Sequence, residues 1–155
     1  MVGDSEEEPW NVGLLLKEES LSHGAWMMVN ILVIDNEESL RFGFRRFLVA
    51  AGHNVVTAKG YREGLARMDE TEFELILANS FLDDGWGIDI LREVVQRNLK
   101  TRVIIMTEYP STETAQDSSR MHAVDYLVKP LRQGGLLYSV NKALQQMEQE
   151  KLNHA

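Results

Sequence analysis

Cysteine is absent from the 155 residues of this chain, and proline occurs only three times. The lack of cysteine excludes a disulfide framework, a thiolate metal site and a cysteine nucleophile. No apolar run approaches the ~18 residues that a membrane-spanning helix needs. The first ten residues, MVGDSEEEPW, are acidic, whereas a secretory signal begins with basic residues. These absences predict a cytoplasmic protein with no membrane partner.

Basic residues are also scarce, and the formal net charge is -8. Residues 1–28 hold six acids and one base, a charge of -5, so the remainder carries -3. A nearly balanced remainder lacks the basic patch of a nucleic-acid-binding protein. The composition shift predicts a flexible acidic extension over residues 1–28, one compact domain over 29–147 and a helical or frayed tail over 148–155.

Apolar runs rich in Val, Ile and Leu are present at five places. Their polarity does not alternate, which is typical of strands buried on both faces of a parallel sheet. The predicted strands are 31–35, 54–58, 75–79, 102–107 and 125–128.

Apolar residues at helical spacing fill the intervals between these runs. The predicted helices are 37–51, 60–70, 87–97, 111–121 and a last one from 133, and Gly52 is predicted to stop the first. Alternating strands and helices favour a flavodoxin-like, doubly wound α/β fold, a three-layer (βα)5 sandwich. Its expected parallel strand order is 2-1-3-4-5.

Polar residues end three of the predicted strands and directly follow a fourth. In such a sheet the carboxyl ends of the strands meet at one edge, where ligands usually bind. The sequence therefore predicts one site built from residues far apart along the chain, namely Asp35, Asn36, Asn79, Thr107 and Lys129.

Four short segments carry a family resemblance. They are ILVIDNEES, NSFLDDGWG, VIIMTEY and DYLVKP. Together they resemble the receiver domain of bacterial two-component response regulators, of the chemotaxis-regulator type, over about residues 30–147. The resemblance implies an aspartate that accepts a phosphoryl group and two further acids that help it to hold Mg²⁺. It also implies a Thr or Ser, a Lys before a proline, and an aromatic residue that reports the switch.

Two of the implied carboxylates are amides in this chain. Asp35 matches the first acid, but Asn36 stands at the position of the second and Asn79 at the phosphoacceptor position. The remaining matches implied by the resemblance are Thr107, the switch aromatic Tyr126, Lys129, and Pro130 in the cis form.

The amides change the chemistry that the site can perform. The neutral amide of Asn79 cannot attack phosphorus as a carboxylate does, so conventional phosphorylation is not expected. Mg²⁺ usually needs one or two carboxylates, and here only Asp35 remains beside Lys129. We therefore expect no cofactor beyond a weak or vestigial magnesium site at Asp35, and no enzymatic activity.

Simpler interpretations of these residues also stand. Acids in a glycine-containing loop are usually turn formers, although Asp83 and Asp84 are possible substitute metal ligands, and Trp86 is either loop packing or an interface anchor. For the remaining site residues, the simpler interpretations are a retained ion pair of Asp35 with Lys129, a turn cap at Thr107 and a core position for Tyr126.

The sequence thus predicts an atypical receiver that stands alone and signals by protein–protein contact. The resemblance implies a histidine kinase or a downstream signalling protein as partner, docking on the fourth helix, fifth strand and fifth helix, roughly residues 111–145, of a monomer or weak homodimer. One alternative is a conventional phosphoaccepting receiver in which Asn79 is introduced or deamidates. Another is a small-molecule or anion sensor that uses Lys129, Thr107 and both asparagines.

Overall fold

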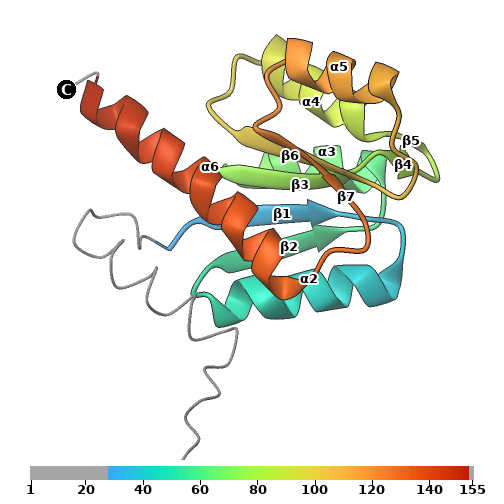
Figure 1. The fold of residues 1–155 in the computed structure, drawn as a ribbon, viewed down its shortest axis with the longest axis horizontal. Coiled ribbons are helices and arrows are strands. Elements are labelled where there is room, and N and C mark those ends of the chain that lie inside the picture. The colour runs from blue at the N-terminus through green and yellow to red at the C-terminus, as the bar shows by residue number, and fades with distance from the viewer. Residues whose placement is uncertain (1–27, 154–155) are drawn as a thin grey trace, which may run out of the picture. The chain divides into compact units, whose positions relative to one another are not determined.

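The strands form one parallel sheet in the computed structural model, which describes residues 28–153 (Figure 1). The sheet has five strands in the order β2-β1-β3-β6-β7. This order, with helices between the strands, confirms the predicted doubly wound fold. The strands are β1 (Asn30–Ile34), β2 (Asn54–Ala58), β3 (Leu75–Asn79), β6 (Arg102–Thr107) and β7 (Asp125–Val128). The predicted acidic extension lies outside the described residues except for its last residue, Met28.

The three central strands are the most deeply buried part of the sheet. All five residues of β3 are buried, as are all but the first residue of β1 and of β6. Apolar side chains therefore fill both faces of these strands, and their run of Val, Ile and Leu shows no polar alternation. The edge strands β2 and β7 are mostly half-buried.

Four helices connect the strands, namely α2 (Glu38–Ala50), α3 (Tyr61–Glu70), α4 (Gly87–Gln96) and α5 (Thr112–Arg120). A further helix, α6 (Gln133–Asn153), follows the last strand. One apolar cluster joins Leu32 and Ile34 of β1 to Ile90 and Val94 of α4 and to partly buried residues of α3. Side chains alternate along a strand, so the neighbouring residues of β1 face the other side of the sheet.

α2 contacts β1 and β2 and buries Phe44 and Leu48. It ends where predicted, because Gly52 adopts a φ of 101°, a left-handed conformation that glycine reaches without strain.

The described residues divide into two units, Met28–Leu131 with the whole sheet and a C-terminal segment from Arg132. In the second unit α6 buries Leu136, Val140, Ala143 and Leu144 at helical spacing. Within residues 28–153, no helix is both long and apolar enough to cross a membrane.

A short hairpin between β3 and α4 was not predicted. Its strands are β4 (Phe81–Leu82) and β5 (Gly85–Trp86), and they pair antiparallel. The hairpin leads into Gly87, whose amide donates a hydrogen bond of 3.0 Å to the carbonyl of Ser80. A Cβ atom at residue 87 would lie only 2.4 Å from the carbonyl oxygen of Asn79, so the chain approaches β3 as closely as it does only because residue 87 has no side chain.

The hairpin also caps a neighbouring helix. The first turn of α3 has no side-chain cap of its own. Asp84 supplies one, because its carboxylate accepts hydrogen bonds from the backbone amides of Tyr61 at 2.7 Å and Arg62 at 3.1 Å. The hydrogen bonds from Arg62 and Tyr61 lower the pKa of Asp84 below its usual range. Asp84 is thus a cap in the structure, rather than only a turn former.

Replacing Gly87 by alanine tests the close approach. We expect Gly87→Ala to lower the free energy of unfolding by about 1–3 kcal/mol, because the methyl group meets backbone that cannot rotate away. Gly43, inside α2, is a matched control, since a Cβ there meets nothing within 4 Å. Gly43→Ala should raise stability by up to about 1 kcal/mol through helix propensity. Urea titration of the three proteins measures both effects, and equal stability of parent and Gly87→Ala would contradict the packing described.

Replacing Asp84 by alanine tests the cap, and its effect depends on pH. The cap requires the carboxylate, whose pKa is lower in the folded state than in the unfolded state, so its stabilisation is present above the ordinary aspartate pKa. It is lost as pH falls through the lowered folded-state value. At pH 7 we expect Asp84→Ala to cost about 0.5–1 kcal/mol, the range of an exposed helix cap. Melting curves at several pH values should show the difference from the parent shrinking toward acid pH; a constant difference would argue against a charged cap.

Candidate functional site

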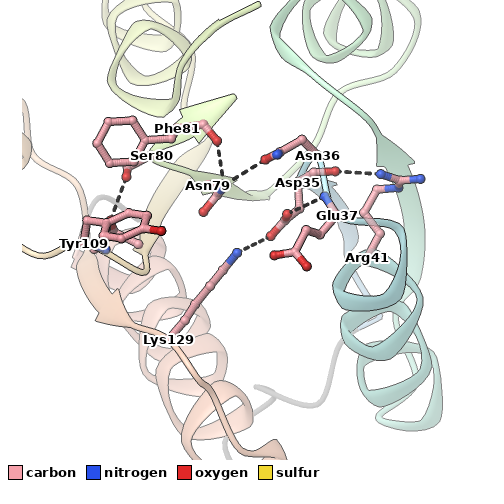
Figure 2. A network of polar contacts seen from close by, with 10 residues as sticks. Asp35, Asn36, Glu37, Arg41, Asn79, Ser80, Phe81, Tyr109 and Lys129 are labelled. Carbon is pink, nitrogen blue, oxygen red and sulfur yellow. Dashed lines mark hydrogen bonds and ion pairs between the residues drawn. The ribbon is translucent and has the colours of Figure 1, made fainter. Parts of the chain in front are cut away.

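Polar side chains gather at the carboxyl edge of the sheet, as the sequence predicts. Figure 2 shows Asp35, Asn36, Asn79 and Lys129 pointing toward one another from different strand ends. Four of the predicted site residues are buried, namely Asp35, Asn79, Thr107 and Lys129. Backbone bonds continue the sheet past the strands here, since the amide of Ser80 donates to the carbonyl of Met106 at 2.7 Å.

The ends of β1 and β7 are joined by a buried ion pair. The Nζ atom of Lys129 lies 2.5 Å from Oδ2 of Asp35, and these side chains are 4% and 0% exposed. The other oxygen of Asp35 accepts a hydrogen bond of 2.9 Å from the backbone amide of Glu37. Both oxygens of the carboxylate are therefore engaged, and the two buried charges cancel.

The amide of Asn79 bridges two oxygens. Its Nδ2 atom donates to Oδ1 of Asn36 at 3.0 Å and to the backbone carbonyl of Phe81 at 2.7 Å. A backbone carbonyl can only accept, so the atom that faces it must be the nitrogen of the amide. A carboxylate at residue 79 would bring an acceptor against the carbonyl of Phe81 and would lose that bond, and it would bond Asn36 only after the Asn36 amide rotated to present its nitrogen.

A second set of hydrogen bonds surrounds Thr107. Its Oγ1 atom accepts a hydrogen bond of 2.8 Å from the hydroxyl of Ser80 and another of 3.0 Å from the backbone amide of Tyr109. The interaction with Tyr109 is the turn cap considered from the sequence. The bond to Ser80 links the ends of β3 and β6 beside the asparagines.

The last two candidates lie on or next to β7. The Lys129–Pro130 peptide bond is cis, the form implied by the resemblance. Tyr126 is half-buried, and its hydroxyl accepts a hydrogen bond of 3.4 Å from the backbone amide of Ser111. Its role as a switch residue stays a prediction.

Three contributors to the site were missed from the sequence. Ser80 supplies a hydroxyl group and Phe81 supplies a backbone carbonyl. Arg41 supplies a guanidinium group that donates a hydrogen bond of 2.8 Å to the backbone carbonyl of Asp35. Ser80 carried a usable signal, because it is a polar residue that directly follows a strand end. A backbone carbonyl carries no sequence signal.

The donor set does not fit Mg²⁺. The carboxylate of Asp35 is paired with an ammonium group, and the oxygens of Asn36 and Phe81 face the N–H bonds of Asn79. A divalent cation would meet an Asp35 carboxylate that already has a cationic partner and, at residues 36 and 79, amides in place of carboxylates. Within residues 28–153, no group of three or more His, Cys, Asp or Glu side chains is arranged so that it could hold a metal ion.

The sheet order, the convergence of strand ends and the buried lysine–aspartate pair are those of a response regulator receiver. Residues 31–141 match the response regulator receiver domain family, and the chain belongs to that family. The receiver is a signalling domain, and the resemblance seen in the sequence is thereby confirmed.

Individual relatives agree with this assignment. The chain is 35% identical over 116 residues to the transcriptional regulatory protein ZraR of Escherichia coli (strain K12), covering 75% of this chain and 26% of that protein. A CheY-like receiver domain protein from Methanospirillum hungatei JF-1 matches with a TM-score of 0.76 and 27% identity, over 80% of this chain and 99% of that one. The beryllofluoride-activated NtrC4 receiver domain dimer matches with a TM-score of 0.71 and 26% identity, over 76% and 97%. The chain therefore spans about a quarter of the length of its curated relative.

Restoring two carboxylates tests whether the scaffold can hold a metal. Asn36→Asp with Asn79→Asp replaces the bridging amide by charges that repel. Charges about 5 Å apart at an effective dielectric near 20 repel by roughly 3 kcal/mol before screening, so a net loss of about 1–3 kcal/mol is expected. Millimolar Mg²⁺ should recover this loss by binding only the folded state, whereas the parent should show little response.

Melting curves of both proteins with and without Mg²⁺ measure the effect. Adding Asp83→Asn to the double variant is the control and should leave the metal response unchanged. An equal response in parent and double variant would mean that the cation binds elsewhere.

Proposed function

We propose that this chain is an atypical receiver that signals by contact with a partner protein and does not use aspartyl phosphorylation at residue 79. The observation that carries the proposal is the pair of hydrogen bonds from the Asn79 nitrogen to Asn36 and to the carbonyl of Phe81. The amide has no nucleophilic oxygen of the carboxylate kind, and its nitrogen lies against the oxygens that a cation would need.

The proposal is also supported by contacts that the protein's own groups make across the site. Hydrogen bonds and one ion pair connect the ends of β1, β3 and β7, and each of these contacts is at least partly buried. Such contacts hold the surrounding loops in one arrangement. A surface fixed in this way is available to a partner at all times and needs no phosphoryl donor.

The partner and its docking face remain proposals. Receiver domains contact kinases and other signalling proteins, and the NtrC4 receiver is known as a dimer. For this chain we keep the face predicted from the sequence, roughly residues 111–145, and a monomer or weak homodimer. That the receiver stands alone likewise remains a prediction.

The two alternative functions have less support. A conventional phosphoacceptor requires an aspartate at residue 79, which would face two acceptor oxygens in the present arrangement. An anion sensor would draw on Lys129, but the charge of this ammonium is already balanced by Asp35. Neither alternative explains why an amide at residue 79 and an amide at residue 36 are hydrogen-bonded to each other.

Incubation with acetyl phosphate and Mg²⁺ tests the proposal. We expect no mass increase of one phosphoryl group on the parent, because the carboxylate nucleophile is missing. The Asn36→Asp, Asn79→Asp variant is the matched comparison, since Asp35, Thr107 and Lys129 are retained in it. Intact-mass measurement and peptide mapping decide the outcome. A phosphoryl group mapped to residue 79 of the unaltered parent would overturn the proposal.

A further inference from the structure

Three exposed aromatic rings touch one another beside the site. Phe81, Trp86 and Tyr109, here called the aromatic cluster, are 43%, 52% and 69% exposed. The ring of Phe81 lies 5.0 Å from that of Trp86 at an interplanar angle of 59°, and 5.8 Å from that of Tyr109 at 76°. Contiguous exposed apolar surface of this kind usually marks a contact site, whereas single exposed rings need no explanation.

The loops that carry the cluster are acidic. Residues 79–86 and 107–113 contain Asp83, Asp84, Glu108 and Glu113 and no Lys, Arg or His. All four acids are exposed. Aromatic faces attract cations through their quadrupole, and arginine is the cation found on them most often. Carboxylates beside the rings provide acceptors for the guanidinium group. The same charges disfavour a nucleic-acid backbone.

The aromatic cluster is held in place by the buried site. The backbone carbonyl of Phe81 accepts the hydrogen bond from Asn79, and the backbone amide of Tyr109 donates to Thr107. Figure 2 shows both aromatic residues next to these polar contacts. Trp86 lies opposite Phe81 in the β4–β5 hairpin. The rings are therefore positioned before any partner arrives, which reduces the ordering cost of binding.

We propose that the aromatic cluster is a docking surface for an arginine-bearing segment of a partner protein. The inference rests on one part of the proposed function, namely that the chain signals by contact with a partner protein. The three rings lie outside residues 111–145, because Phe81 and Trp86 follow β3 and Tyr109 follows β6. A second copy of the chain is a poorer occupant, since the same acidic loops would face each other.

The first experiment titrates the full chain, labelled with ¹⁵N, with a nine-residue peptide of three Gly-Ser-Arg repeats. We expect amide shifts in the loops of the aromatic cluster and at the indole of Trp86. The lysine version of the peptide should bind at least about threefold more weakly, since arginine stacks better on rings. The glutamate version should not bind. Shifts confined to other surfaces, or no shift up to about 1 mM peptide, would overturn the proposal.

Variants distinguish the contribution of the aromatic rings to peptide affinity from that of the overall charge. Trp86→Ala keeps the net charge of -8, so binding that depends only on charge would survive it. We expect at least about a fivefold loss of affinity in Trp86→Ala and a smaller loss in Glu108→Gln. Phe42→Ala is the matched control, because Phe42 is a 61% exposed aromatic residue of α2, outside both these loops and residues 111–145. Unchanged affinity in Trp86→Ala would sink the proposal, and melting curves verify that each variant is folded.

Sedimentation of the parent and of Trp86→Ala tests the rival occupant. A parent dimer that Trp86→Ala dissociates would assign the cluster to self-association and would overturn the proposal. The peptide titration uses unphosphorylated protein, whereas the proposed function is tested by phosphoryl transfer to residue 79. Failure of one can therefore be told from failure of the other.

Discussion

The ion pair between Lys129 and Asp35 sets the electrostatic balance on which the rest of the site depends. Both groups are buried, so removing either charge would leave the other uncompensated at a cost of about 3–5 kcal/mol. With this pair in place the site is neutral, and any further carboxylate would need a cation. The amides of Asn36 and Asn79 add hydrogen bonds without adding charge. The polar side chains of Asp35, Asn36, Asn79 and Lys129 are therefore paired with protein atoms.

Most of the fold could be predicted, because the periodic pattern of apolar residues is local. The strands over residues 54–58, 75–79, 102–107 and 125–128 agree with the structure residue by residue, and the first differs by one position. The β4–β5 hairpin was missed, since strands of two residues have no periodicity to detect. The capping role of Asp84 was missed because its partners, the amides of Tyr61 and Arg62, lie 23 and 22 residues away.

The location of the site was predictable, but its bonding was not. The carboxyl ends of parallel strands must share one edge, so Asp35, Asn79 and Lys129 were expected to converge. Which atoms pair depends on side-chain rotamers and on backbone groups such as the carbonyl of Phe81. The sequence left Asp35 and Lys129 as either a retained ion pair or part of a phosphorylation site, and the structure shows the ion pair without testing its role.

The two charges of that pair are 94 residues apart along the chain. During synthesis Asp35 leaves the ribosome long before Lys129, and burying it alone would cost several kcal/mol. We therefore expect the end of β1 to stay hydrated until β7 is complete. Closure of this edge is then expected among the last folding events, because it joins residues 94 positions apart. A chain that stops before β7 would lack the lysine that neutralises Asp35 and would leave this edge of the sheet open.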